Sequence, residues 1–211
     1  MYVGRIVAVG MNTQGKLAAM YRVSSRSFPN RKAVLREKVA SIVPKEGFEG
    51  DVFKNPYIAY NCLKIVKSVA VVTNGAHTDP IAEKIALGLP IRDAMALSLL
   101  ALDFEKDNYN TPRIASAVDL KTRTGWLGIV RHDGINVRQM PLEPSNAFYV
   151  ATYEKNDCAL DQTKSFEVMD AAAACKYILG FGVFGQMTNP VSAVCAFEQD
   201  GDFVIASEPQ G

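Results

Sequence analysis

Apolar and polar residues alternate along many segments of the chain, which is the pattern of β-strands with one buried face. Two such segments, 3–10 and 16–23, flank the turn sequence MNTQGK and predict an antiparallel hairpin. The segment AVLREKVASIVP predicts two more short strands, although a helix over 32–43 fits its pattern too. Further strands are predicted in PYIAYNCLKIV, SVAVVTNG, RIASAVDL, GWLGIVR, NVRQMPL, AFYVATYE, SAVCAFE and DFVIASE, the last two forming a hairpin around QDGD.

Helical spacing replaces this alternation in two regions. Asp79 is suited to cap a helix with Pro80 at its first position and Gly88 at its C-terminal end. A second helix is predicted from Pro90, with its last turn reaching Glu105, and a third in VMDAAAACKYIL. Helices grouped between antiparallel hairpins predict an α+β fold, for which two sheets packed face to face and covered outside by helices is a reasonable architecture.

Composition and charge narrow the class of protein. The 211 residues are 48% hydrophobic and suffice for one domain over 1–211. The formal net charge of +1 predicts no nucleic-acid partner. Neither a signal peptide nor a long apolar run is recognisable, so we expect a cytoplasmic protein without a membrane partner. The four cysteines form no C-x-x-C pair and the two histidines lie far apart, so we expect free thiols and no metal site.

The sequence GFGVFG matches the glycine spacing of a dinucleotide-binding turn. That fingerprint requires a strand before it and a helix after it, whereas here a predicted helix precedes it and QMTNP follows. We therefore expect no dinucleotide cofactor.

The stretch RVSSRSFPNR contains three arginines and no acid, which is unusual in a nearly neutral protein. Guanidinium groups form bidentate, charge-assisted hydrogen bonds with phosphate, and serine hydroxyls can bind its remaining oxygens. Arg22 and Arg26, together with Ser24 and Ser25, are therefore candidates for binding a phosphate monoester.

Polar residues beside predicted strand and helix ends form a second candidate group. Glu105 is expected at a helix C-terminus, where the macrodipole would raise its pKa and suit it to proton transfer. Tyr60 and Cys62 lie two apart on a strand and should share a face. If that side lines a pocket, Asn61 faces away from it; if it lines the core, Asn61 is the polar contact. A hydrolase pair of Cys62 and His77 is an alternative source of chemistry.

Five of these segments, YRVSSRSFPNR, NPYIAYNC, TNGAHTDPIAEKI, LGLPIRDA and EKDNYNTPRI, resemble the archaeal type of inosine monophosphate (IMP) cyclohydrolase. The resemblance runs from MYVGRI through the strands after Ile114, and the part from about Cys158 matches loosely. It implies a four-layered αββα sandwich like that of the N-terminal nucleophile hydrolases, but without the nucleophile. The bulky Tyr2 after Met1 agrees with that absence, because it should prevent removal of the methionine.

The resemblance also implies a reaction, the cyclisation of 5-formamidoimidazole-4-carboxamide ribonucleotide to IMP with loss of water, the last step of purine synthesis. By resemblance, Glu105 is the general acid/base and Arg31 stabilises the developing oxyanion. No cofactor is required. Candidates for holding base and ribose are Tyr60, Asn61, Cys62, Asn74, Asn110, Thr111 and Arg113.

Two other functions remain open from the sequence: an amide hydrolase that uses Cys62, and a sensor that binds a purine nucleotide without turnover. Both the cyclohydrolase and the sensor hypotheses predict a small-molecule purine nucleotide as the binding partner. A homo-oligomer is compatible with the sequence, which does not determine the oligomeric state.

Overall fold

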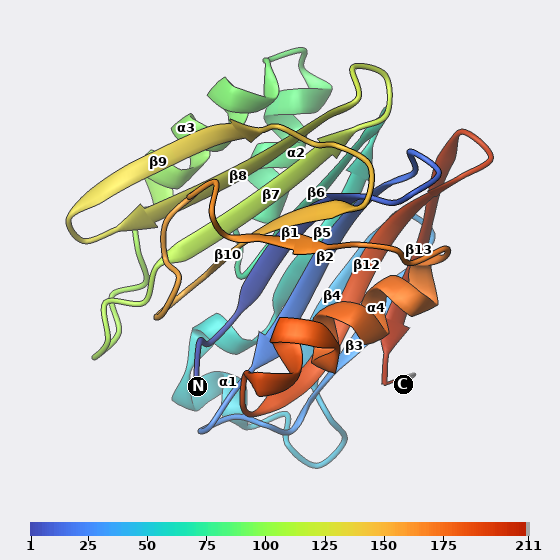
Figure 1. Ribbon diagram of the computed structural model, residues 1–211. Helices are drawn as coiled ribbons and strands as arrows, with labels where there is room; N and C mark the ends of the chain where they lie inside the picture. The colour runs from blue at the N-terminus through green and yellow to red at the C-terminus, as the bar shows by residue number, and fades with distance from the viewer. Residues whose placement is uncertain (210–211) are drawn as a thin grey trace.

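Two antiparallel sheets that pack face to face form the centre of the protein (Figure 1), as described for residues 1–209 by a computed structural model. The six-stranded sheet contains, in spatial order, β11 (Thr163–Ser165), β10 (Asn146–Ala151), β1 (Ile6–Met11), β2 (Leu17–Ser24), β12 (Pro190–Gln199) and β13 (Asp202–Glu208). The seven-stranded sheet contains β3 (Arg31–Arg36), β4 (Val39–Pro44), β5 (Tyr60–Val66), β6 (Val69–Thr73), β7 (Arg113–Asp119), β8 (Thr124–Arg131) and β9 (Gly134–Met140).

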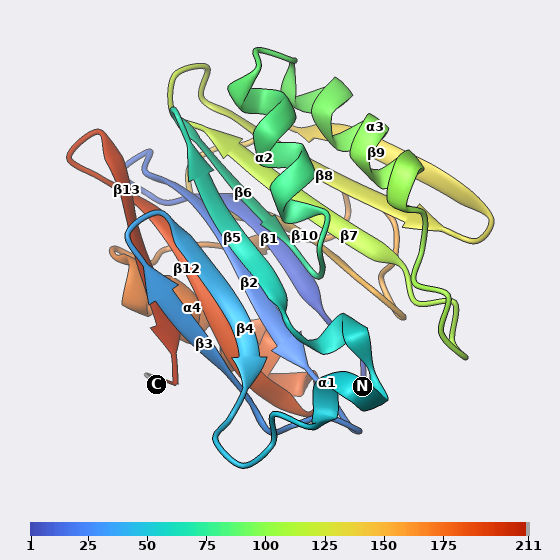
Figure 2. The same cartoon turned by 180° about the vertical axis from the view of Figure 1, so that it is seen from behind.

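Helices cover the outer faces of both sheets. Helices α2 (Thr78–Ala86) and α3 (Ile91–Leu102) pack on the seven-stranded sheet, as Figure 2 shows from behind. Helix α4 (Ala171–Gly180) packs on β2, β12 and β13, and the short α1 (Asp51–Lys54) lies between β4 and β5. The predicted α+β class with two antiparallel sheets is therefore confirmed, with four α-helices among residues 1–209. None of the helices in that range has the length and apolar character needed to cross a membrane.

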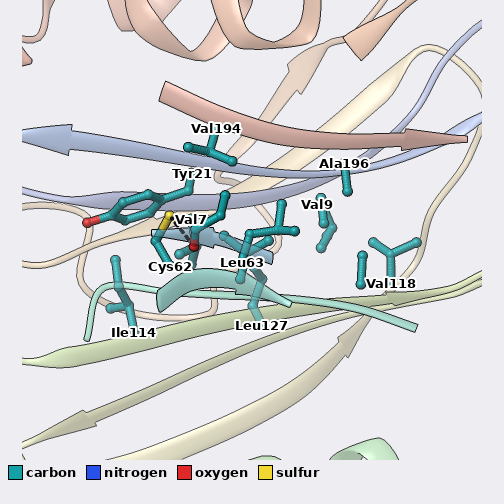
Figure 3. Close-up of a cluster of buried hydrophobic side chains, with 14 of the residues drawn as sticks. Val7, Val9, Tyr21, Cys62, Leu63, Ile114, Val118, Leu127, Val194 and Ala196 are labelled. Carbon is teal, nitrogen blue, oxygen red and sulfur yellow. Dashed lines mark hydrogen bonds between the residues drawn. The ribbon is translucent and has the colours of Figure 1, made fainter. Parts of the chain in front are cut away.

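The main hydrophobic core lies between the two sheets (Figure 3). Strand β2 illustrates how the sequence builds it, because all eight of its residues are buried and successive side chains point to opposite faces. Leu17 and Tyr21 join the core between the sheets, whereas Ala18 and Met20 join a second core beneath α4. Burying one large apolar side chain contributes about 1.5–3 kcal/mol, so these two cores hold the layers together.

The two sheets use the chain in different ways. All seven strands from β3 to β9 pair with a sequence neighbour. The six-stranded sheet instead joins both ends of the chain, with Val7 opposite Val150 and Tyr21 opposite Val194. Along the chain, the segment 31–140 that forms the seven-stranded sheet is thus inserted between β2 and β10 of the six-stranded sheet.

The predicted strands are largely confirmed, and the helix alternative over 32–43 is wrong, since β3 and β4 form a hairpin there. The strand predicted in PYIAYNCLKIV begins only at Tyr60, because Pro56–Ile58 form a 3₁₀ turn. The sequence GFGVFG (residues 180–185) begins at the last residue of α4 and continues into another 3₁₀ turn, Gly182–Gln186, rather than a strand-to-helix turn. The short elements α1 and β11 were not predicted.

Two predicted helix ends also need correction. Helix α2 begins at Thr78, so Asp79 lies in its first turn and does not cap it. Gly88 does follow the helix with a positive φ of 98°, as its predicted place at the C-terminal end requires. Helix α3 ends at Leu102, so Glu105 lies on the following loop and not in the last turn.

Candidate active site

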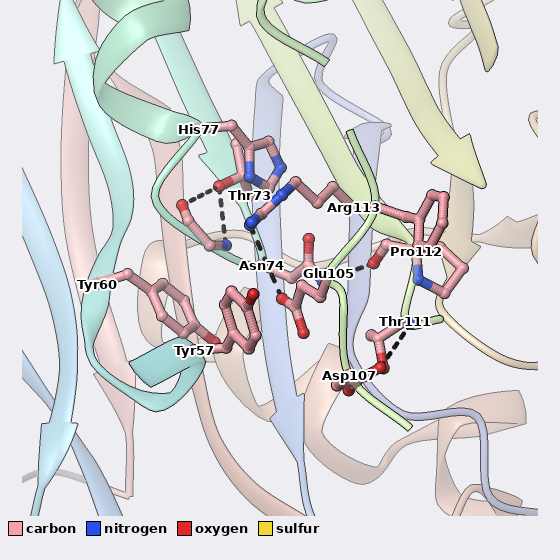
Figure 4. A network of polar contacts seen from close by, with 12 residues as sticks. Tyr57, Tyr60, Thr73, Asn74, His77, Glu105, Asp107, Thr111, Pro112 and Arg113 are labelled. Atoms are coloured by element: carbon pink, nitrogen blue, oxygen red, sulfur yellow. Dashed lines mark hydrogen bonds and ion pairs between the residues drawn. The ribbon is translucent and has the colours of Figure 1, made fainter. Parts of the chain in front are cut away.

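Glu105 is a buried carboxylate with arginines near both of its oxygens, of which Figure 4 shows Arg113. Glu105 has only 1% of its surface exposed. Its Oε2 accepts a hydrogen bond of 2.8 Å from Nη2 of Arg5, which lies just before β1. Its Oε1 is 3.9 Å from Nη1 of Arg113, the first residue of β7. Burial raises the pKa of the Glu105 carboxyl, and the charges of Arg5 and Arg113 oppose that shift. The cause is therefore burial and not the predicted helix dipole.

The loop that carries Glu105 is closed by its own polar groups. The Glu105 N–H donates to the Thr111 carbonyl at 2.8 Å. Asp107 accepts from the Thr111 N–H at 2.9 Å and from the Thr111 hydroxyl at 2.7 Å, and that hydroxyl also lies 3.0 Å from the Tyr153 hydroxyl. Thr111, predicted to bind substrate, thus has its hydroxyl engaged in shaping the loop.

Tyr60 lies in the same cluster and connects the two sheets. Its hydroxyl is 2.6 Å from that of Tyr21, which comes from β2 of the other sheet. Burial raises the pKa of Tyr60, whereas the charges of Arg31 and Arg5 oppose the shift. Both guanidinium groups therefore act on the Tyr60 hydroxyl. Arg5 also holds Glu105, so Tyr60 and Glu105 share one arginine, and the charge of Arg31 acts on the same Tyr60 hydroxyl.

Arg31 is a buried cation at the start of β3, with 4% of its surface exposed. Its Nε donates to the Phe28 carbonyl at 3.0 Å, which fixes the guanidinium against the preceding turn. Within residues 1–209, Arg31 has no carboxylate within 4.0 Å. Its charge is therefore available to an anion.

Asn74 fixes the approach of β7 to this cluster. Its Nδ2 donates to the Pro112 carbonyl at 3.0 Å and its Oδ1 accepts from the Ile114 N–H at 2.8 Å. These bonds hold the backbone on both sides of Arg113, whose side chain then reaches Glu105. Asn74, a predicted substrate contact, thus acts as a brace for Arg113.

His77 is a further member of this polar cluster, and the sequence analysis considered it only as part of the alternative Cys62–His77 hydrolase pair. It is fully buried, and its Nε2 donates to the Ile114 carbonyl at 2.9 Å, which leaves Nδ1 as an acceptor. Burial, reinforced by the charge of Arg113, lowers the pKa of His77 to about 3. The ring is therefore neutral at physiological pH.

Unpaired buried polar atoms concentrate in this cluster. Seven buried side-chain nitrogen or oxygen atoms of the described residues have no hydrogen-bond partner. Four of them belong here: Nε of Arg5, Nε of Arg113, Oε1 of Glu105 and Nδ1 of His77. Because buried polar groups are normally paired, two free donors and two free acceptors in one place suit a polar ligand.

The arginine stretch does not act as one phosphate site. Arg22 and Ser24 point toward α4, where the fully buried Arg22 guanidinium donates to the carbonyls of Phe184 at 2.9 Å and Met187 at 2.5 Å. The prediction for Arg22 and Ser24 is therefore corrected: Arg22 holds the chain after α4. Ser25 accepts from the Phe28 N–H at 2.9 Å, and the exposed Arg26 lies 4.2 Å from the Tyr2 ring centre.

The predicted contacts around Tyr60 divide between the two faces of the sheet. Asn61 faces α2, where it donates to Asp79 at 3.0 Å and accepts from Ser41 at 2.7 Å, so it is removed from the substrate-binding set. Cys62 faces the core, and its thiol donates to the Ala40 carbonyl at 3.4 Å. Burial raises the pKa of the Cys62 thiol, and His77 Nε2 is engaged with a carbonyl. A Cys62–His77 hydrolase pair is therefore not formed.

A polar pocket of about 360 Å³ lies beside the cluster and is within the size range of small-ligand sites. It is lined by Tyr109, Asn110, Pro112, Arg131, His132, Asp133, Thr152, Tyr153 and Asn156. Asn110, a predicted substrate contact, thus faces a cavity. In the described part of the chain, no three His, Cys, Asp or Glu side chains are grouped to hold a metal ion.

Sequence reasoning missed Arg5, Tyr21 and the acceptor of His77. Arg5 did carry a signal, because it is the only basic residue in the largely apolar opening segment MYVGRIVAVG. Tyr21 carried none, because an aromatic residue within a buried strand is ordinarily part of the core.

Comparison with known proteins adds evidence that is independent of this geometry. Residues 2–202 match the family described as IMP cyclohydrolase-like protein. Proteins named IMP cyclohydrolase from Methanocella arvoryzae, Methanosphaera stadtmanae and Methanocaldococcus jannaschii are 49%, 47% and 42% identical to the chain. The alignments cover 97%, 95% and 95% of this chain and 96% of each relative. The chain therefore belongs to the IMP cyclohydrolase-like family.

Proposed function

We propose that this protein is an IMP cyclohydrolase that closes the ring of 5-formamidoimidazole-4-carboxamide ribonucleotide. The observation that carries the proposal is the buried Glu105, whose Oε2 is held by Arg5 while its Oε1 remains unpaired. Such a carboxylate can take and return a proton. The near-full-length similarity to proteins named IMP cyclohydrolase supports the same reaction.

In the proposed first step, the carboxamide nitrogen attacks the formyl carbon and a C–N bond forms. Glu105 Oε1 takes one proton from that nitrogen, while the formyl C=O electron pair moves onto oxygen. The buried cation of Arg31 stabilises this oxyanion, a contribution worth about 3 kcal/mol in comparable sites. Its lack of a protein carboxylate partner among residues 1–209 supports this role.

In the second step, Glu105 returns the proton to the oxygen, which leaves the former formyl carbon as water. The second hydrogen of that water comes from the formamido nitrogen, and the lone pair left there forms the new ring double bond. Oxygen and both hydrogens of the water thus come from the substrate, and no oxidant or group carrier takes part. The Tyr60 hydroxyl, near Arg31 and Arg5, is proposed to hold the formyl group in its reactive rotamer.

The substrate-binding residues in the proposal differ from the sequence prediction. Tyr60 and Arg113 remain, because both border Glu105 or its arginine partner. Asn110 remains because it lines the adjacent polar pocket, and Arg26 remains as the exposed cation nearest to Tyr2. We also propose a cytoplasmic enzyme of one domain over 1–211 that takes a small-molecule purine nucleotide.

The finer fold assignment belongs to the same proposal. We infer the four-layered αββα sandwich of the N-terminal nucleophile hydrolases, here without their nucleophile. The order of helices, sheet, sheet and helix supports it (Figures 1 and 2).

The experiment incubates purified protein with the formamido ribonucleotide and separates the nucleotides over time. We expect wild type to form IMP, Glu105→Gln to lose turnover, and Arg31→Lys to slow it about a hundredfold. Glu46→Gln and Arg36→Lys make the same changes at exposed positions and should leave the rate unchanged. Binding of IMP by wild type without any turnover would replace this proposal with the nucleotide sensor.

A further inference from the structure

The side chain of Thr152, directly after β10, takes the place of a backbone partner of Arg5. Ile6 lies opposite Ala151, so Arg5 and Thr152 form the next pair between β1 and β10. The Thr152 N–H donates to the Arg5 carbonyl at 3.1 Å, and in a regular antiparallel pair the Thr152 carbonyl would accept the return bond. The Arg5 N–H donates instead to the Thr152 hydroxyl oxygen, also at 3.1 Å.

The same hydroxyl holds the residue on the other side of Gly4. Thr152 is fully buried, and its Oγ1 donates to the Val3 carbonyl at 3.2 Å. Gly4, between these two bonds, has a φ of 72°, in the left-handed region that favours glycine. A Cβ added at Gly4 would overlap the Thr152 hydroxyl and lie 2.8 Å from the Tyr153 ring. The hydroxyl thus closes a tight turn that has no room for a side chain at Gly4.

The alternation of faces along the opening strand breaks at this turn. Residues two apart on a regular strand share a face, and Val7 packs between the two sheets. Val3 should follow the same alternation, but it packs in the core beneath α4. Arg5 is the first residue after the break, and its Nη2 reaches Glu105 Oε2 at 2.8 Å, on the loop between α3 and β7. The turn at Gly4 therefore precedes the contact that orients the candidate base.

We propose that Thr152 is a positioning residue, whose hydroxyl holds the turn at Gly4 and thereby aims the Arg5 guanidinium at Glu105 Oε2. In this role it acts through the backbone of Arg5. The inference rests on the proposed function for the role of Glu105 as the base, and it adds a residue that the proposed reaction does not include.

The charged groups around this ion pair make the position of Arg5 measurable. Burial raises the pKa of the Glu105 carboxyl, whereas the charges of Arg5 and Arg113 and the hydrogen bond from Arg5 lower it, and Asp107 raises it. Withdrawal of Arg5 should therefore move the pKa of Glu105 upward.

Arg5 itself stays charged while Glu105 titrates. Burial opposes its charge, but nearby groups outweigh burial and raise the pKa of Arg5 above its ordinary value. These groups are Glu105 and the hydroxyls of Tyr60, Tyr21 and Tyr153. The acid limb of a pH profile therefore reports on Glu105 and not on Arg5.

The test compares variants that remove or keep the Thr152 hydroxyl. Thr152→Val preserves the shape of the side chain and removes both hydrogen bonds of the hydroxyl, so the acid limb of kcat/KM should move to higher pH. The plateau should fall about tenfold, because Glu105 loses the bond that orients it. Thr152→Ser keeps the hydroxyl and should keep the wild-type limb. Thr122→Val removes an exposed hydroxyl between β7 and β8, and as the matched control it should change neither quantity.

An unchanged limb in Thr152→Val, or the same shift in Thr152→Ser, would overturn the proposal and leave Thr152 a structural residue. If Thr152→Val does not fold, Gly4→Ala makes the same test, because its Cβ displaces the hydroxyl and its limb should also move to higher pH. In an Arg5→Gln background, Thr152→Val should cause no further shift, and an additional shift would exclude action through Arg5.

A second readout separates this inference from the proposed function. Carbon-13 NMR of the Glu105 carboxyl measures its pKa without any turnover. An upward shift in Thr152→Val supports the positioning role even in a protein that makes no IMP, whereas turnover by wild type with no shift in the variant refutes the positioning role alone.

Discussion

Replacing Arg22 by methionine should destabilise the protein while leaving nucleotide binding intact. Arg22 lies on β2, its guanidinium is fully buried, and burial lowers its pKa only to about 10, so it is charged at neutral pH. It donates to the Phe184 carbonyl at 2.9 Å and the Met187 carbonyl at 2.5 Å, with longer contacts of 3.4 Å and 3.5 Å to Thr188 and Ile178. Methionine fills similar space without any donor.

The two short bonds determine the expected loss. Each bond comes from a charged donor and is worth about 1.5–3 kcal/mol, so the two together contribute about 4 kcal/mol. The Phe184 carbonyl keeps a second donor, the Met187 N–H at 3.1 Å. Relief of the buried charge offsets part of this cost, which leaves a net loss of about 3 kcal/mol. For a chain of this size that corresponds to a fall in Tm of about 9 °C.

Urea denaturation followed by circular dichroism measures the loss, and steady-state kinetics below the transition measures KM for the formamido ribonucleotide. Arg26→Met, at an exposed position, is the matched control and should change stability little. A tenfold or larger rise in KM for Arg22→Met with unchanged stability would refute the structural reading and restore Arg22 to the phosphate site.

Three further predictions concern the polar cluster and its neighbours. Arg5→Gln removes the closest cation from Glu105, so the acid limb of kcat/KM should move to higher pH; an unchanged limb would mean that Arg5 does not lower this pKa. The folded-state pKa of His77 lies below its ordinary value of 6.5, so the unfolded chain binds a proton that the folded chain rejects as pH falls from about 6.5 to about 3. Lowering the pH from 7 to 4.5 should therefore cost about 2.5 kcal/mol through His77, and urea titrations of His77→Gln should show a shallower pH dependence. Cys62→Ala should retain turnover, and in native wild type this thiol should resist iodoacetamide; inactivation by alkylation at Cys62 would revive the hydrolase alternative.

Local sequence patterns were sufficient to predict most strands and helices but not which strands pair with each other. The hairpin of β1 and β2 follows from alternation around a turn, and α2 ends at Gly88 as its sequence predicts. No local pattern places β2 against β12, because register between distant segments depends on the whole core. The helix predicted to reach Glu105 ended early, since Asp103 has a φ of 54°, which an α-helix does not accommodate.

Site residues could be predicted where the type of side chain alone indicates its chemistry. They could not be predicted where the role depends on which groups the side chain contacts in the fold. Arg22 and Arg31 look alike in the sequence, but the first meets backbone carbonyls and the second has no described carboxylate nearby. Strand parity did separate Asn61 from Tyr60. Arg5 belongs to the site because it contacts Glu105, one hundred positions away, and no spacing along the chain predicts that contact.

The insertion of the seven-stranded sheet between the parts of the other sheet implies an order of folding. Residues 31–140 pair strand by strand with sequence neighbours, so each closure there is short and entropically cheap. The pairing of β2 with β12 must wait for a segment synthesised near the end of the chain. Arg5 precedes β1 in that later sheet, whereas Glu105 lies on a loop of the early segment, between α3 and β7. We therefore expect the ion pair at the candidate active site to be among the last contacts to form, so that partly folded chains would lack it.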